Sequence, residues 1–132
     1  MAGDSGTPLL KKLGIGEDTR LALISDSGEV IGPLPEGVRV TRRVQGKADV
    51  AVAFFTDRAD FVRRIEKLGT MIFPAGALWV AWPKRASGIA TTMTEHVVRE
   101  VALPLGLVDN KVCAIDDTWT GLRVVWRRER RP

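Results

Sequence analysis

The stretch that decides the fold is ALWVAWPKRASGIATTMT, residues 77–94. It begins with the apolar run Leu78–Trp82, which stands between Gly76 and Pro83 and has the length of a buried strand in an α/β sheet. A polar loop follows, and Thr94 is a good N-cap for a helix. The stretch predicts a core strand that delivers a polar loop to the start of a helix, and it contains no diagnostic catalytic motif.

The length and composition indicate one globular domain. The chain has 132 residues, of which 45% are hydrophobic and 27% are charged, so it can bury one core and lacks the polar bias of a disordered chain. We expect a single α/β domain over residues 1–132. No apolar run approaches the length of a membrane span, and the N-terminus lacks a basic segment followed by a hydrophobic one. We therefore expect no membrane association and a cytoplasmic protein.

Cysteine and histidine each occur once. Cys113 lies in the apolar run Val112–Ile115, and a single cysteine can form neither an internal disulfide nor a cysteine metal cluster. The expected state is a buried, inert thiol. His96 follows Glu95 at the start of an expected helix, with no metal-ligand spacing around it. The sequence predicts no metal site and a solvated His96.

The net charge of +4 is concentrated at the C-terminus. Residues 123–132 contain five arginines and one glutamate, so the rest of the chain sums to zero. A basic tail over residues 127–132 gives weak, salt-sensitive binding to polyanions, whereas specific recognition of nucleic acid needs a basic face spread over the fold. A solvated terminus that helps solubility is favoured, and weak polyanion binding through the tail is the alternative.

Six segments read as strands. The third is nearly all apolar, as expected for a strand that is covered on both faces. Between the first and second strands, a short segment rich in glycine and proline leaves room for one distorted helical turn at most. The last two segments flank the turn at residues 116–121 and should form an antiparallel hairpin. The expected strands are Arg20–Ser25, Val38–Arg43, Asp49–Phe55, Leu78–Trp82, Leu107–Ile115 and Leu122–Trp126.

Three helices are expected, one before the first strand and two between later strands. A short one begins at Thr7-Pro8 and is closed by Gly14. A longer one is capped by Asp57, and its apolar residues recur at helical spacing, which is typical of a core stripe. A third begins at Thr94 and is stopped by a proline and a glycine. The core stripe of the second helix consists of Phe61, Ile65, Leu68 and Ile72.

This order of elements resembles the second half of the class I methyltransferase-like Rossmann fold, and residues 55–82 resemble its fourth and fifth strands. The resemblance implies a reduced three-layer α/β fold with about three helices. Its six-stranded, mostly parallel sheet would have the order 2-1-3-4-6-5, with the last strand antiparallel. Nearly the whole chain also resembles a family of small bacterial proteins of unknown function, which implies no particular activity. The phrases that carry this second resemblance are residues 5–9, 11–15, 78–84, 100–114 and 116–122.

The turn after the first strand departs from a cofactor-binding pattern. It reads Ser25-Asp26-Ser27-Gly28, with one glycine in place of the run of glycines that lets a cofactor approach the backbone. We therefore expect no cofactor and no useful affinity for S-adenosylmethionine. An enzyme that uses S-adenosylmethionine through an unusual site would need this turn to approach the cofactor. Asp49 or Asp57 would then have to replace the missing contacts.

Ligands of open α/β sheets bind beyond the carboxyl ends of the parallel strands. The loops after the first, third and fourth strands and the terminal turn should converge there. Lys84 and Arg85, with nearby hydroxyls and a helix start, could hold a small anionic ligand. The alternative is an ordered loop in which Thr94 only caps its helix. We expect no catalytic residue and nine ligand-binding residues, Ser25, Asp26, Trp82, Lys84, Arg85, Ser87, Thr94, Asp116 and Trp119.

Two pairs of residues that include members of this set have competing interpretations. Trp82 and Trp119 both lie at strand ends and could wall a pocket, although packing at the rim of the core is favoured. Asp116 and Asp117 are adjacent carboxylates whose side chains point apart at a strand end, so they cannot share a proton as a catalytic dyad does. A turn role is expected for both.

Three classes of function follow from these observations. A non-catalytic module that binds a small molecule or a protein partner, with a regulatory role, is favoured because neither cofactor glycines nor a nucleophile-base pair is found. The first alternative is an S-adenosylmethionine-dependent methyltransferase-like enzyme with an atypical cofactor site. The second is a nucleic-acid-associated protein that acts through the arginine tail.

Overall fold

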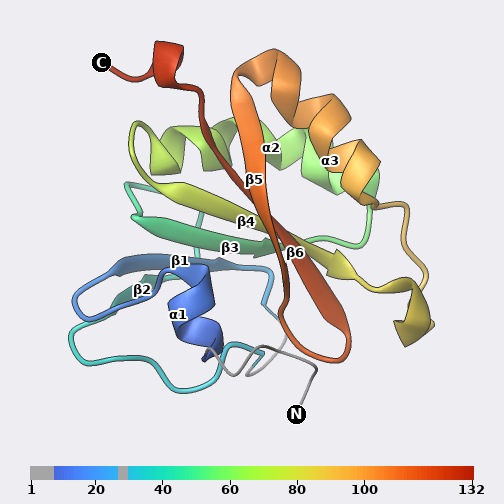
Figure 1. Ribbon diagram of the computed structural model, residues 1–132, viewed down its shortest axis with the longest axis horizontal. Helices are drawn as coiled ribbons and strands as arrows, with labels where there is room; N and C mark the ends of the chain where they lie inside the picture. Colours follow the sequence, from blue (N-terminus) through green and yellow to red (C-terminus); the bar gives the residue numbers. More distant parts are fainter. Residues whose placement is uncertain (1–7, 27–29) are drawn as a thin grey trace.

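A six-stranded sheet runs through the computed structural model, which describes residues 8–26 and 30–132 (Figure 1). Its strand order is β2-β1-β3-β4-β6-β5. The first four strands are mutually parallel, and β6 runs antiparallel to both of its neighbours. The predicted fold and strand order are therefore confirmed. The strands are β1 Arg20–Ile24, β2 Arg39–Thr41, β3 Val50–Phe54, β4 Ala77–Pro83, β5 Leu107–Ala114 and β6 Trp119–Trp126.

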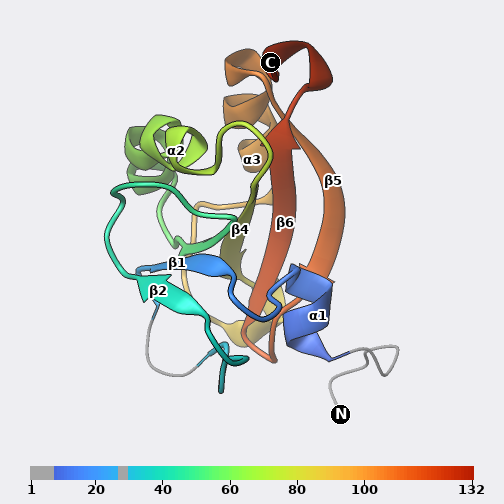
Figure 2. The same ribbon diagram turned by 90° about the vertical axis from the view of Figure 1, so that its left-hand side faces the viewer.

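Helices lie on both faces of the sheet (Figures 1 and 2). Helices α2 (Arg58–Ile72) and α3 (Glu95–Ala102) cover one face, and the short helix α1 (Leu9–Leu13) lies on the other. Each long helix begins at a capping side chain, because the first backbone N–H groups of a helix have no partner within it. The Asp57 carboxylate accepts from Ala59 N–H at 3.2 Å, and the Thr94 hydroxyl accepts from Val97 N–H at 3.1 Å. The described residues also form short 3-10 turns at Arg85–Ser87, Leu103–Leu105 and Arg128–Arg130.

Strand β4 is buried along its whole length. Successive side chains of a strand point to opposite faces, so β4 contributes to two cores. Val80 and Trp82 pack in the core beneath α2 and α3. Trp79 packs in the core on the α1 face, where its indole N–H donates to Leu13 O at 3.0 Å. The continuous apolar run in the sequence thus reflects burial on both faces.

The segment between β1 and β2 replaces a crossover helix. Residues 30–38 contain no helix, and Ile31 and Leu34 pack from this segment onto the core of the α1 face. The short, proline-rich sequence explains this arrangement, because it has neither the length nor the backbone N–H groups for a regular helix. The loop between β1 and β2 therefore covers much of the sheet face on which α1 lies.

Two strand ends differ from the sequence prediction by two residues or more. Strand β2 is an edge strand and ends at Thr41, two residues earlier than expected. Strand β6 begins at Trp119 because the Asp116 carboxylate closes the hairpin turn early, accepting from the N–H groups of Thr118 and Trp119. Helix α1 ends as predicted at Gly14, which has φ 84°. The expected cap at Thr7 and the last two residues of the Ser25–Gly28 turn lie outside the described residues.

Cys113 is a free, buried thiol with 7% of its surface exposed, as predicted, and burial raises its pKa. In the described part of the chain, no helix combines the length and the apolar character that a membrane crossing requires.

Candidate functional site

The carboxyl edge of the sheet, where β1 to β4 end, carries the candidate site. The chain leaves β1 toward β2 on one side, while β3 and β4 lie on the other side. Such a change of direction is where open α/β sheets bind ligands. Two separate cavities open along this edge, one beside β1 and β2 and one between β4 and α3.

The first cavity, which we name the Asp26 cavity, has a volume of about 290 Å³. Apolar side chains of β1 and of the following loop form most of its wall, and two charged side chains, Asp26 and Arg42, complete it. Arg42 follows the last residue of β2 and therefore reaches the same edge of the sheet as Asp26. The lining residues are Leu23, Asp26, Ile31, Gly32, Pro33, Leu34 and Arg42.

Asp26 is the most unusual polar group of this cavity. Its side chain is only 3% exposed, and its Oδ2 lies 3.1 Å from Nη1 of Arg42. Its Oδ1 is buried and makes no hydrogen bond to any residue that the structure describes. A buried acceptor without a donor costs about 1–3 kcal/mol. A ligand that brings a hydrogen-bond donor into this cavity would remove that cost.

Ser25 gives the turn before Asp26 an unusual backbone. It has φ 60°, a left-handed conformation that few residues other than glycine adopt. Its hydroxyl accepts from Nη1 of Arg64 at 3.0 Å, which ties the end of β1 to helix α2. The chain thus reaches a glycine-like backbone conformation at Ser25 although the sequence has no glycine there.

The second cavity, which we name the Trp82 cavity, has a volume of about 500 Å³. It lies between the end of β4 and the start of α3, beside the loop that Figure 1 shows passing outward from β4 and back to α3. Three of the predicted site residues, Trp82, Arg85 and Thr94, line it. The full lining is Trp82, Pro83, Arg85, Gly88, Ile89, Thr91, Met93, Thr94 and Glu95.

Lys84 and Ser87 lie in the same loop but outside that lining. The N–H of Lys84 donates to Thr118 O at 2.7 Å, which joins the loop to the terminal hairpin. The Ser87 hydroxyl donates to Lys84 O at 2.7 Å and accepts from Ile89 N–H at 3.2 Å. These contacts shape the loop that carries Arg85.

The two tryptophans of the predicted site lie at the same edge but on opposite faces. Pro83 of β4 pairs with Trp119 of β6, and Trp82 pairs with the next residue, Thr120. Trp82 belongs to the core beneath α2 and α3, whereas Trp119 packs against the core of the α1 face. The structure does not bring these two rings into one cavity. Asp116, beside Trp119, holds the hairpin turn through its carboxylate.

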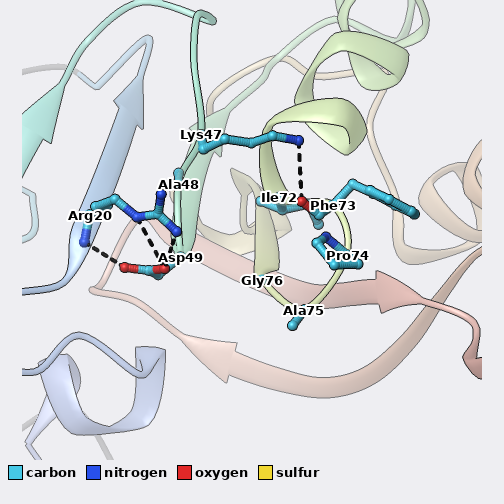
Figure 3. Close-up of a pocket in the computed structure, with 9 residues that line it drawn as sticks. All are labelled: Arg20, Lys47, Ala48, Asp49, Ile72, Phe73, Pro74, Ala75 and Gly76. Carbon is cyan, nitrogen blue, oxygen red and sulfur yellow. Dashed lines mark hydrogen bonds and ion pairs between the residues drawn. The ribbon is translucent and has the colours of Figure 1, made fainter. Parts of the chain in front are cut away.

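A third cavity, of about 320 Å³, lies at the opposite, amino edge of the sheet (Figure 3). Its charged groups are all paired. Arg20 Nη2 lies 2.8 Å from Asp49 Oδ1, and Lys47 Nζ donates to Thr70 O at 3.0 Å and Phe73 O at 3.3 Å. The hydrogen bond from Arg20 lowers the pKa of the Asp49 carboxyl below its usual value. We assign this cavity a structural role, because its polar groups have partners within the protein.

This arrangement also decides what Asp49 and Asp57 can contact. Asp49 is paired with Arg20 at the edge remote from the Asp26 cavity, so it cannot supply a ligand contact there. Asp57 follows β3 at the carboxyl edge, where its carboxylate accepts the cap hydrogen bond of α2. In residues 8–26 and 30–132, no three His, Cys, Asp or Glu side chains gather in a way that could hold a metal ion.

Sequence reasoning missed Arg42 and the apolar wall formed by Ile31 and Leu34. The expected second strand, Val38–Arg43, extended past the observed end of β2, so Arg42 was counted as part of the strand. The signal that could have found it is the edge position of this strand. Edge strands are short, and an early end places Arg42 in the loop at the carboxyl edge.

Comparison with known proteins adds information on the fold. No protein-family model matches the chain, and no curated protein matches its sequence. The fold is similar to that of magnesium protoporphyrin IX methyltransferase from Synechocystis PCC 6803 with bound SAM, with a TM-score of 0.59 and 12% identity over 89% of this chain and 74% of that chain.

Two further structures have similar folds. For the N-methyltransferase NodS from Bradyrhizobium japonicum WM9, the TM-score is 0.57 at 15% identity, over 91% of this chain and 93% of that chain. For a SAM-dependent methyltransferase from Aquifex aeolicus, it is 0.56 at 12% identity, over 88% and 86%. The chain therefore has a methyltransferase-like Rossmann fold.

Proposed function

We propose that the protein is an S-adenosylmethionine-dependent methyltransferase-like enzyme whose cofactor site is atypical. The observation that carries the proposal is the similarity of its fold to three methyltransferases over 88% or more of this chain. Because the sequence identities are 12–15%, the similarity concerns the fold, and the local chemistry has to be tested on the residues themselves.

The Asp26 cavity has a donor and acceptor set that suits this cofactor. S-adenosylmethionine has an α-amino acid end with an ammonium and a carboxylate, ribose hydroxyls and an adenine ring. The unpartnered Oδ1 of Asp26 can accept from an ammonium or a hydroxyl, and Arg42 can donate to a carboxylate. Leu23, Ile31 and Leu34 offer an apolar wall for a ring.

The size of the cavity and the backbone at Ser25 determine how the cofactor could bind. The cavity volume of about 290 Å³ is at the lower end of ligand pockets, which measure about 300–1,000 Å³. The cavity would therefore enclose one part of the cofactor, with the rest in the open mouth. The left-handed Ser25 supplies the sharp turn that a glycine would otherwise provide. When bound, the cofactor supplies a methyl group for transfer to a nucleophilic atom of a second substrate.

Isothermal titration calorimetry with S-adenosylmethionine and S-adenosylhomocysteine tests the proposal. We expect the wild-type protein to bind both, and Asp26→Ala to weaken binding about tenfold or more, because a hydrogen bond to a buried charged acceptor is lost. Asp117→Ala is the matched control, since Asp117 is an exposed carboxylate of the hairpin turn, and it should bind as the wild type does. Absence of binding by the wild type, or equal affinities for Asp26→Ala and wild type, would refute the proposal.

A second candidate is a non-catalytic module that binds an anionic ligand. The observation that favours it is the position of Arg42, which is 63% exposed at the end of β2, beside the cavity. In dinucleotide-binding folds, an arginine near this position accommodates a phosphate. A thermal-shift comparison of ATP, NADP and S-adenosylmethionine separates the candidates, because a ligand of the native state raises the melting temperature. A shift with a phosphate ligand that Arg42→Ala removes, without a shift from S-adenosylmethionine, would favour the module.

A further inference from the structure

The Trp82 cavity shares no lining residue with the Asp26 cavity. It lies on the α2 and α3 face, whereas the apolar wall of the Asp26 cavity, Leu23, Ile31 and Leu34, belongs to the core of the α1 face. The two cavities are therefore separate sites at one edge of the sheet, and the Trp82 cavity can be assigned a ligand without reference to any cofactor.

One wall of the Trp82 cavity is apolar and firmly held. Trp82 is 8% exposed and Met93 is 2% exposed, and both belong to the core beneath α2 and α3. Ile89, in the loop above them, is 44% exposed. A large aromatic ring that the core holds in place is a good surface for a flat ligand, because little conformational entropy is lost when the ligand binds.

The indole N–H of Trp82 has no partner among the described residues. Trp79 donates its indole N–H to Leu13 O, and Trp126 donates to Gly69 O at 2.9 Å. No such bond is made by Trp82, although only 8% of this residue is exposed. Asp26 Oδ1 is the one buried side-chain nitrogen or oxygen without a partner among the described residues, so the Trp82 N–H, which has no acceptor among them, is accessible to solvent. An oxygen atom of a bound ligand would supply one.

The charges around this cavity favour an anion. Glu95, the acidic residue of the lining, is already paired with Arg99. Arg85 is exposed and forms no ion pair with any residue that the structure describes. Its guanidinium, a planar group that binds carboxylates in a bidentate manner, is thus available. The Thr94 hydroxyl, which accepts from Val97 N–H, donates to none of the described residues and adds a second donor.

We infer that the Trp82 cavity binds a planar aromatic acid, with the ring against Trp82 and Ile89 and the carboxylate bound by Arg85. A flat ring would contact the apolar wall, and a carboxylate would accept from the free donors. A ligand therefore needs both groups to match the whole lining. The inference does not depend on the proposed function, because it concerns binding at a separate cavity.

Nuclear magnetic resonance of the indole N–H signals tests this inference, with 1-naphthoate as the probe and neutral 1-naphthamide as its matched ligand. The chain has four tryptophans, and the spectrum of Trp82→Phe identifies the Trp82 signal. We expect 1-naphthoate to move this signal saturably and 1-naphthamide to bind more weakly. Should Trp82→Phe not fold, Ile89→Ala, a change at an exposed residue of the lining, identifies the signal by its shift.

Two arginine variants decide the role of charge. Arg85→Ala should weaken 1-naphthoate binding about five- to tenfold, as expected for loss of one charge-assisted hydrogen-bond partner, and leave 1-naphthamide binding unchanged. Arg43→Ala removes an exposed arginine that follows β2 and should change neither affinity. A Trp82 signal that 1-naphthoate does not move would overturn the inference, as would equal 1-naphthoate affinities for Arg85→Ala and Arg43→Ala.

Discussion

Trp119 packs edge-on against Phe54, with ring centroids 5.0 Å apart and ring planes at 87°. The two residues come from β6 and β3, which are not neighbours in the sheet. The contact therefore spans β4 on the α1 face and fixes the terminal hairpin to the centre of the sheet. The sequence placed Trp119 among ligand-binding residues, and this contact gives its ring a packing partner within the protein.

We predict that Trp119→Ala destabilises the protein by about 1–3 kcal/mol, less than a fully buried tryptophan would cost, because Trp119 is only partly buried. Urea denaturation measures the change in the free energy of unfolding. Trp119→Phe keeps an aromatic contact and should recover most of the loss. If Trp119→Ala and the wild type have the same urea concentration at the unfolding midpoint, the aromatic contact does not stabilise the hairpin.

Asp26→Ala should leave the stability of the ligand-free protein unchanged or raise it by up to about 1 kcal/mol. The substitution removes a buried oxygen atom without a partner among the described residues, and Arg42 is 63% exposed and can be hydrated once the ion pair is lost. Thermal and urea denaturation check this. A loss of more than about 2 kcal/mol would mean that the Asp26–Arg42 pair is needed for folding.

The Arg20–Asp49 pair predicts a pH dependence of stability. The folded-state pKa of Asp49 is lowered, first by the hydrogen bond from Arg20. A lowered pKa means that the pair stabilises the folded protein above the unfolded-state pKa of about 3.9 and that this contribution is lost as the pH falls through the folded-state value. Urea titrations from pH 6 down to pH 3 should therefore show a smaller loss of stability for Asp49→Asn than for wild type. Asp117→Asn serves as the control and should follow the wild-type curve.

Gly76→Ala should destabilise the protein by about 2 kcal/mol or more. A Cβ at Gly76 would lie 2.8–2.9 Å from three backbone oxygens, those of Ile72, Ala48 and Asp49. Backbone oxygens cannot move aside as the end of a flexible side chain can. Gly16→Ala is the matched control, because a Cβ there would meet no atom within 4 Å. Equal melting temperatures for the two variants would show that the turn before β4 yields easily.

Deletion of Arg128–Pro132 should preserve the fold and weaken binding to heparin. The cut spares Arg127, whose N–H donates to Gly106 O at 2.9 Å. It removes three arginines and one glutamate, a net loss of two positive charges. The double variant Arg39→Ala with Arg43→Ala removes the same net charge from another part of the chain. Its elution from heparin should shift less than that of the deletion variant if the clustering of charge governs the binding. Equal elution of the deletion variant and the wild type would rule out the alternative that the tail binds polyanions and leave it as a solvated terminus.

The fold could be predicted from the sequence because its signals are local and agree with one another. The runs at Leu78–Trp82 and Asp49–Phe55 are apolar without alternation, which places them at the centre of the sheet, and β3 and β4 are indeed neighbours there. The caps at Asp57 and Thr94 fixed two helix starts. The start of β6 was harder to predict than these elements. Composition alone does not distinguish an aspartate that closes a turn with its side chain from an aspartate at a strand end.

The candidate site was harder to predict than the fold because it depends on which face each side chain occupies. Alternation along β4 sends Trp82 to the α2 and α3 face, and pairing across the sheet sends Trp119 to the other. Each assignment follows from register, which the sequence does not specify between distant strands. Arg42 was missed for a related reason, since its position depends on where an edge strand ends.

The antiparallel direction of β6 determines where a tag or a surface can be joined to the protein without covering the cavities. Trp119 begins β6 at the carboxyl edge, and Trp126 ends it beside Leu107, the first residue of β5, at the amino edge. Residues 127–132 therefore leave the sheet at the end opposite both cavity mouths (Figure 1). An affinity tag, a reporter domain or a sensor surface joined at Pro132 would stand away from the openings. Ligand screens on immobilised protein should accordingly use that terminus as the anchor.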